Sequence, residues 1–337
     1  MKTFSIITFG CRTNQAESRL IGEELVNASM KPARGWSASG RQCNNETIAD
    51  LVIINACAVT AKAEKEVRQY IRRVKRENPQ CLLLITGCFT DKTKVIPKKD
   101  LINNQSHKAY YQDKYSLSGK AVVKIQDGCN HFCTYCIVPY LRGRSKSRPA
   151  EKIIREIKGL EIRKIKEVIL TGIDIADYKN LPKLLKLILA QTNIKKISFG
   201  SINIEAFNQD FLKLFPNSRL SSHFHIPLQS GCDETLKRMN RKYSISNFQL
   251  QLSNIQKEIP GFTLSTDIIV GFPGETDTEF DESLRSLKGL KGLITKIHVF
   301  RYSPRTGTLA AKMEKKWGKI REQTKKERAR KISNLLI

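Results

Sequence analysis

Three cysteines lie close together near the middle of the chain, at Cys129, Cys133 and Cys136. Cysteine thiolates are the usual ligands of iron–sulfur clusters, and a [4Fe–4S] cluster has four irons to ligate. Three thiolates on one loop leave the fourth iron open, which favours chemistry on a bound substrate over electron transfer alone. The alternatives are three structural thiols or a zinc site. Zinc loops usually contain two Cys-x-x-Cys or Cys/His pairs, and His131 is poorly placed inside the loop to complete a tetrahedron.

A second set of cysteines follows the strands expected in the first 90 residues. Apolar runs alternate there with helical periodicity, which predicts a parallel α/β sheet. The expected elements are strands at 4–9, 51–54 and 82–85 and helices at 14–27 and 61–77. Cys11, Cys57 and Cys88 each follow one strand, and the carboxyl ends of parallel strands meet at one edge, where ligands bind. Half-buried structural thiols are the alternative, but three equivalent positions favour a shared site.

The rest of the chain predicts a linker, a barrel and a tail. Residues 91–120 are polar and are expected to be a linker. Six strand–helix units follow, which predict a partly closed parallel (β/α)6 barrel over residues 121–311. The expected strands are 121–126, 167–171, 195–199, 223–227, 264–270 and 295–300, and the expected helices are 150–165, 181–190, 206–214, 233–239, 246–259 and 278–288. Cys129 follows the first strand, at the end where barrel chemistry is found. Residues 312–337 are expected to form a basic C-terminal helix.

The sequence around the central cysteines narrows the chemistry. Cys-x-x-x-Cys-x-aromatic-Cys, with Tyr135 as the aromatic residue, resembles the signature of radical S-adenosylmethionine (SAM) enzymes. The flanking runs at 125–129, 137–140 and 142–148 resemble the methylthiotransferases that modify tRNA, in particular the threonylcarbamoyladenosine branch. This resemblance covers nearly the whole chain. It implies an N-terminal flavodoxin-like methylthiotransferase domain over residues 1–90, followed by a partial radical SAM barrel.

The resemblance implies two [4Fe–4S] clusters and SAM as cofactors. Cys129, Cys133 and Cys136 would be the catalytic ligands of the cluster that binds SAM. The N-terminal trio Cys11, Cys57 and Cys88 would hold the cluster that supplies sulfur. Segments at the strand ends resemble the family's sequence motifs. They imply cofactor contacts at Tyr135, Thr171, Gly172, Asp174, Ser201, Gln229, Gly271 and Phe272. The match is weakest at residues 200–203, because the family tends to have a glutamate where this chain has Asn203.

The implied reaction inserts sulfur into a modified adenine. A 5′-deoxyadenosyl radical made from SAM would abstract hydrogen from C2, and a second SAM would methylate the inserted sulfur. The implied product is 2-methylthio-N6-threonylcarbamoyladenosine next to the anticodon, a base in a single-stranded loop that can be splayed out. A first alternative is an enzyme that acts on isopentenyladenosine in tRNA or on an aspartate of a ribosomal protein. A second is a non-catalytic RNA-binding paralogue that keeps the clusters as structural pieces.

The charge of the chain favours a polyanionic partner. It has 59 lysines and arginines against 32 acidic residues, a formal net charge of +27. Such an excess is typical of nucleic-acid binders, although a general lysine bias is the alternative. The guanidinium fork suits phosphate, and arginines gather at 68–76 and after the central cysteines. RNA contacts are expected at Arg142, Arg144, Arg148, Arg301 and Arg305, and as a further hypothesis along residues 312–337.

Location and partners follow from the thiols and from the resemblance. No run of about eighteen apolar residues exists, so no membrane span is expected. Nine cysteines without an export signal favour reduced thiols in the cytoplasm. The resemblance implies tRNA, an electron donor of the flavodoxin or ferredoxin type and the iron–sulfur assembly machinery as partners, and we expect a monomer. Family members usually continue into a small β-barrel RNA-binding domain, the TRAM domain, which we expect this chain to lack.

Overall fold

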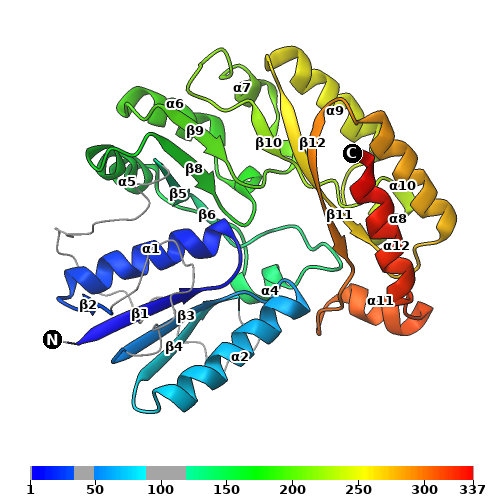
Figure 1. Cartoon of the computed structure of the whole chain (residues 1–337). Coiled ribbons are helices and arrows are strands. Elements are labelled where there is room, and N and C mark those ends of the chain that lie inside the picture. Colours follow the sequence, from blue (N-terminus) through cyan, green and yellow to red (C-terminus); the bar gives the residue numbers. More distant parts are fainter. Residues whose placement is uncertain (1, 34–48, 89–118, 337) are drawn as a thin grey trace.

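The computed structural model describes residues 2–33, 49–88 and 119–336. The predicted linker over residues 91–120 therefore lies almost wholly outside the described residues. Two parallel α/β units make up the described part, and α1 of the N-terminal unit packs against β5 of the second unit (Figure 1). None of the described helices is both long and apolar enough to cross a membrane.

The N-terminal unit is a parallel sheet with one helix on each face. Its strands β1 (Thr3–Thr8), β2 (Lys31–Pro32), β3 (Leu51–Ala56) and β4 (Leu82–Gly87) lie in the order β2-β1-β3-β4. Side chains alternate across a strand, so β3 contributes to two cores. Ile53 packs on the side of α1 (Arg12–Asn27), and Ile54 packs on the side of α2 (Ala61–Glu77). This is the parallel α/β sheet that the apolar runs predict.

The second unit is a parallel barrel that stays open. One sheet holds β5 (Lys120–Lys124), β8 (Glu167–Thr171) and β9 (Lys196–Phe199), and the other holds β10 (His223–His225), β11 (Thr263–Val270) and β12 (Ile294–Arg301). Bridges between Ile197 and Leu220 and between Ser201 and His225 join the two sheets. Among the described residues β5 does not pair with β12, so the six strands form the partly closed barrel that the sequence predicts.

Helices cover the outside of the barrel and shield an apolar core. They are α5 (Ala150–Ile162), α6 (Leu181–Gln191), α7 (Gln209–Leu212), α8 (Asp233–Arg238), α9 (Ile245–Glu258) and α10 (Asp277–Gly289). Part of the core is a group of phenylalanine rings, in which Phe199 stacks on Phe224 at a centroid distance of 5.3 Å. The predicted helix at 206–214 is instead a 3₁₀ turn, η4 (Ile204–Ala206), followed by α7. The α-helix begins at Gln209 and not at residue 206, because the Asn208 side chain accepts a hydrogen bond from the Phe211 amide and caps α7.

The loop with the central cysteines is held between short elements. The expected strand at 121–126 ends at Lys124, and β6 (Gln126–Asp127) pairs antiparallel with β7 (Lys146–Ser147). Between them lie the cysteine loop and α4 (Val138–Arg142). The loop is therefore closed at its base by a two-stranded ladder and leads directly into a short helix.

The C-terminal segment differs from the predicted solvated basic helix. It forms two helices, α11 (Leu309–Trp317) and α12 (Glu322–Ser333), and α12 packs against β12. Lys325 and Arg328 of α12 are buried, and both charged groups have partners. Lys325 donates to the Tyr302 carbonyl at 3.2 Å, and Arg328 pairs with Glu275 at 2.6 Å. These two basic residues hold the helix onto the barrel and are not available to RNA.

Candidate cluster and cofactor site

The N-terminal cysteines converge at one edge of their sheet. Cys11 follows β1, Cys57 follows β3 and Cys88 follows β4, and these three strands are neighbours. Gly10 has a φ of 106°, and a Cβ added there would lie 2.6 Å from the Cys57 Cβ, so only glycine allows this approach. Cys57 and Cys88 are each 3% exposed, whereas Cys11 is exposed. Burial raises the pKa of Cys57 to about 11, and the nearby Cys88 and Cys11 act in the same direction.

The central cysteines converge on the loop between β6 and α4. The Cys136 amide donates to the Cys133 carbonyl at 3.0 Å, and the His131 amide donates to the Cys129 sulfur at 3.3 Å. Burial raises the pKa values of Cys129 and Cys136 to about 12; Cys136 and Cys133 add to the rise at Cys129, and Cys133 adds to the rise at Cys136. The Arg241 guanidinium lies 3.6 Å from the Cys133 sulfur. The loop thus gathers three thiols with one cation beside them.

Both trios offer a sulfur-only donor set, which is the set that iron–sulfur clusters take. Thiols with raised pKa values are protonated at neutral pH, and a coordinating metal deprotonates them. A mixed set also exists, because the Cys129 sulfur and carboxylate oxygens of Asp174 and Asp177 lie within 4.8 Å of one another. Asp174 already accepts hydrogen bonds from its own segment and its neighbours, so we interpret both carboxylates as supports of the loop. The residues present therefore fit a [4Fe–4S] cluster at each trio.

Asp174 begins a chain of contacts that reaches the central cysteines. It lies 3.1 Å from the His131 ring and accepts a hydrogen bond of 2.7 Å from the Asn203 side-chain amide. The bond to Asp174 raises the pKa of His131. The Asn203 oxygen in turn accepts from Arg241 at 2.9 Å, and Arg241 contacts Cys133. The residue that departs from the family pattern therefore joins an acid at the end of β8 to a cluster cysteine.

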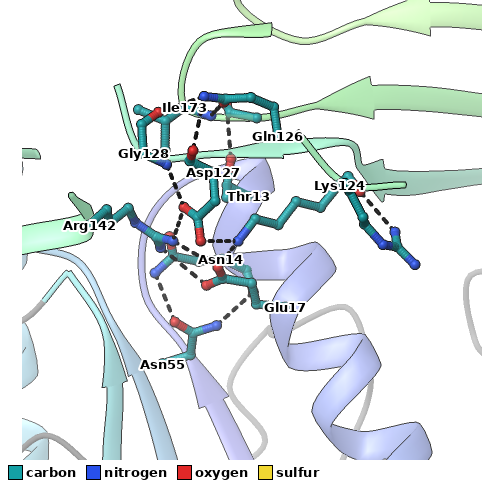
Figure 2. Close-up of polar contacts among 12 residues, drawn as sticks. Thr13, Asn14, Glu17, Asn55, Lys124, Gln126, Asp127, Gly128, Arg142 and Ile173 are labelled. Carbon is teal, nitrogen blue, oxygen red and sulfur yellow. Dashed lines mark hydrogen bonds and ion pairs between the residues drawn. The ribbon is translucent and has the colours of Figure 1, made fainter. Parts of the chain in front are cut away.

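Gln126 holds the segment after β8 against the loop. Its side-chain oxygen accepts from the Ile173 amide at 3.0 Å (Figure 2) and from the Asp174 amide at 2.9 Å. Its side-chain nitrogen donates to the Gly128 carbonyl at 2.7 Å. A Cβ at Gly172 would lie 2.7 Å from the Gln126 oxygen, so the glycine permits this contact. Sequence reasoning missed Gln126, although a polar residue at the end of an otherwise apolar strand is a usable signal.

The other predicted cofactor residues lie at the carboxyl ends of the strands. Thr171 ends β8 and is buried, and Ser201 follows β9 and is exposed. The Gln229 backbone has a φ of 72°, and its amide donates to the Asp267 carbonyl at 2.8 Å. The Tyr135 ring lies on the loop and meets Phe272 edge to face at 6.5 Å. Thr171, Ser201, Gln229 and Tyr135 thus share one end of the barrel.

Gly271 and Phe272 pack against protein, and their predicted contact with the cofactor stays a prediction. Gly271 has a φ of 70°, and a Cβ there would lie 2.4 Å from the Lys325 Cγ. Its lack of a side chain is explained by the close packing of α12. Phe272 is fully buried in a small core with Met239 and Tyr302. Gly271 therefore packs against α12, and Phe272 packs in the small core at this end of the barrel.

Arg142 lies between the two units, and its side chain is buried. Its Nε is 2.8 Å from the Cys88 sulfur. Its Nη1 donates to Glu17 at 2.7 Å and to Asp127 at 3.0 Å, as Figure 2 shows. Its side chain is 5% exposed. The predicted contact with RNA phosphate does not fit this burial. Arg305 departs from its prediction for the same reason, because it is buried and pairs with Glu64 at 3.3 Å.

The remaining three predicted RNA contacts lie nearer the surface. The Arg144 guanidinium is exposed and lies 4.6 Å from the centroid of the Phe132 ring. Arg148 is half-buried and pairs with Glu156 at 2.5 Å. Arg301 is about half exposed and pairs with Glu322 at 3.3 Å. Arg144 and Arg301 are therefore accessible to a polyanion, and Arg148 is only partly so.

Known proteins resemble both units. Residues 123–287 match the Radical SAM superfamily, and residues 3–109 match a group described as "Uncharacterized protein family UPF0004". A threonylcarbamoyladenosine tRNA methylthiotransferase MtaB from Thermotoga maritima is 34% identical, over 97% of this chain and 80% of that protein. A tRNA-2-methylthio-N(6)-dimethylallyladenosine synthase from Endomicrobium trichonymphae is 32% identical, over 92% of this chain and 78% of that protein.

A solved structure shares the fold across both units. The radical S-adenosylmethionine methyltransferase TsrM from Kitasatospora setae superposes with a TM-score of 0.65, over 94% of this chain and 78% of its own. Its sequence identity to this chain is 11%. This likeness shows the arrangement of the elements and nothing about the substrate.

Proposed function

This chain belongs to the radical SAM tRNA methylthiotransferase family, and we propose that it adds a 2-methylthio group to N6-threonylcarbamoyladenosine next to the anticodon of tRNA. The observation that carries the proposal is the nearness of the two cysteine trios, which Arg142 links. Arg142, on the helix that follows Cys136, reaches the sulfur of Cys88 at 2.8 Å. Cys88 also adds to the raised pKa of Cys136, after burial, which is the largest cause. A sulfur source beside the radical centre is what this chemistry requires.

We propose that each trio holds one cluster. Cys129, Cys133 and Cys136 would ligate a [4Fe–4S] cluster that binds SAM, and Cys11, Cys57 and Cys88 would ligate a second cluster. When bound, these clusters supply the electron that cleaves SAM and the sulfur that is inserted. The protein would orient the SAM segment through Gln126 and Asp174, and the buried loop would exclude water. Thr171, Gly172, Ser201, Gln229 and Tyr135 are the proposed SAM contacts at the same end of the barrel.

The substrate assignment distinguishes this proposal from its nearest rival. Relatives named for threonylcarbamoyladenosine and for dimethylallyladenosine both exceed 30% identity, and one of the former is 36% identical over 91% of this chain. We assign threonylcarbamoyladenosine for this reason. The exposed Arg144 and Arg301 are the proposed phosphate contacts, with Arg148 beside them. The proposed domains are residues 1–90 and 121–311, joined by a linker.

The proposal also names partners and a location. tRNA is the macromolecular substrate, and a donor of the flavodoxin or ferredoxin type would supply electrons. The iron–sulfur assembly machinery would load both clusters. The enzyme would act as a monomer in the cytoplasm, where its tRNA substrate is found.

Mass analysis of tRNA nucleosides tests the function. Cells that lack this gene should lose 2-methylthio-N6-threonylcarbamoyladenosine and accumulate the unmethylthiolated nucleoside. Wild-type protein and the Cys81→Ser variant should restore the product, because Cys81 belongs to neither trio, whereas Cys133→Ser should not. Loss of 2-methylthio-isopentenyladenosine instead would assign the rival substrate. Unchanged levels of both nucleosides would favour a non-catalytic paralogue or another substrate.

A further inference from the structure

The contact between Arg142 and Cys88 is unusual because the two residues come from different units. Arg142 ends α4 of the barrel unit, whereas Cys88 directly follows β4 of the N-terminal sheet. Its Nε faces the Cys88 sulfur at 2.8 Å, and its Nη2 lies 3.3 Å from the Asn14 side-chain oxygen. The side chain is almost completely shielded from solvent. A guanidinium in such a place is retained only if its donors are used.

The charges around Arg142 balance without Cys88. Glu17 pairs with both Arg142 and Lys124, and Asp127 pairs with the same two cations. Two carboxylates and two cations therefore lie together, and their formal charges cancel (Figure 2). The bond from Arg142 Nε to the Cys88 sulfur lies outside this balance. It is an additional interaction directed at one sulfur of the N-terminal trio.

We propose that Arg142 is a positioning residue for the cluster held by Cys11, Cys57 and Cys88. It donates to the Cys88 sulfur and fixes that sulfur relative to the helix that follows Cys136. This inference rests on the proposed function, because it requires a cluster at the N-terminal trio. Hydrogen bonds to cluster sulfurs and nearby charge set the reduction potential of iron–sulfur clusters. A donor that carries positive charge stabilises the reduced state, which holds one more negative charge.

The test uses the full chain with Cys129, Cys133 and Cys136 changed to Ser, so that only the N-terminal cluster can form. After anaerobic reconstitution, iron per chain and the midpoint potential of the cluster are measured. Arg142→Met/Glu17→Gln removes the donor together with its carboxylate partner, which avoids leaving a buried charge unpaired. Glu17→Gln alone is the matched control within the network. Arg155→Gln, an exposed arginine on α5, is the control for loss of one positive charge.

The expected result is a more negative potential in the double variant at unchanged iron content. A tenfold fall in the reduction equilibrium constant is expected, which is 59 mV for a one-electron couple. Arg155→Gln should retain the parent potential to within a third of that shift, and Glu17→Gln, which removes a carboxylate near the cluster, should not lower it. Arg142→Lys, which keeps the charge but not the planar fork, should fall between the parent and the double variant.

The outcomes separate this inference from the proposed function. Equal potentials in all variants at equal iron content would overturn the role of Arg142 and leave the two-cluster proposal intact. A parent protein that binds no iron would overturn both. If the double variant loses its iron, Arg142→Lys decides: a potential below that of the parent supports the inference, and an unchanged potential contradicts it.

Discussion

The Thr13 hydroxyl donates a hydrogen bond of 3.0 Å to the Gly172 carbonyl across the interface between the two units. Thr13 follows Cys11 by two residues, and Gly172 lies in the proposed SAM segment. One hydrogen bond therefore joins the first turn of α1, next to Cys11, to the proposed SAM segment. The interface positions the two sites through contacts of this kind as well as through the buried charges.

Thr13→Val should loosen this connection without changing the shape of the side chain much. Loss of the hydrogen bond should cost about 1 kcal/mol of stability, and amide exchange should rise at residues 171–174. Thr8→Val is the matched control, because the Thr8 hydroxyl bonds to Ser18 within the N-terminal unit. Hydrogen-exchange mass spectrometry checks the difference. Equal exchange at 171–174 in both variants would mean that the Thr13 bond does not restrain this segment.

The buried pair of Glu17 and Lys124 should be costly to break from one side. Their side-chain atoms lie 2.5 Å apart, and both residues are buried. Lys124→Met should lower the free energy of unfolding by up to about 3–5 kcal/mol, because buried Glu17 loses one of its two cations and the group gains a net negative charge. Lys124→Met/Glu17→Gln should cost less than the sum of the single changes.

Urea unfolding of the single and double variants measures this coupling. Glu66→Gln on the exposed face of α2 is the control, since Glu66 lies 3.9 Å from Lys62 in solvent and its loss should cost less than about 1 kcal/mol. Strictly additive effects of the Glu17 and Lys124 changes would show that the pair is not coupled.

Asn203 should matter for SAM affinity because it both donates to Asp174 and accepts from Arg241. Asn203→Asp keeps the acceptor but removes the donor and places a second carboxylate beside Asp174. We expect the Kd for SAM to rise about tenfold, which corresponds to about 1.4 kcal/mol. Asn208→Asp is the matched control, because aspartate caps a helix as well as asparagine does. Equal SAM affinity of the two variants, measured by calorimetry, would remove Asn203 from the site.

His298 should make the barrel less stable in mild acid. Burial lowers its pKa from the usual 6.5, and His225 and Lys296 add to this while Asp267 opposes it. The unfolded chain then binds the proton first as the pH falls. Stability is therefore present above pH 6.5 and is lost between 6.5 and the lower pKa of the folded state. His298→Gln should flatten the fall of the melting temperature between pH 7 and 5.

The lowered pKa of His223 also destabilises the fold in mild acid. The melting temperature of the His298→Gln variant should therefore still fall to some extent between pH 7 and 5. Thermal unfolding in buffers across this pH range checks the prediction. The same slope in wild type and variant would show that His298 does not contribute.

The positions of the cysteines could be predicted because they depend on local rules. Apolar runs predicted the strands, and parallel strands end at a common edge, so Cys11, Cys57 and Cys88 had to approach one another. The same rule predicted Cys129 at the barrel end. Their role as cluster ligands stays a prediction that rests on the family and on the sulfur-only donor set.

The environment of the arginines could not be predicted because it depends on how the two units meet. Nothing in the sequence distinguishes Arg142, which faces Cys88, from Arg144, which faces solvent two residues later. Both lie in a basic run that suits phosphate. The partner of Arg142, Glu17, is 125 residues away in the chain. The bond between Arg241 and Asn203 could not be predicted for the same reason, because it joins residues that are far apart in the sequence.

The two-cluster arrangement is tested most directly by the iron content of anaerobically reconstituted protein. Wild type should bind about eight irons per chain. A variant with Cys11, Cys57 and Cys88 changed to Ser should bind about four, and so should the corresponding variant of Cys129, Cys133 and Cys136. About four irons in wild type, with none lost on changing the N-terminal trio, would contradict the account and leave sulfur insertion without a donor.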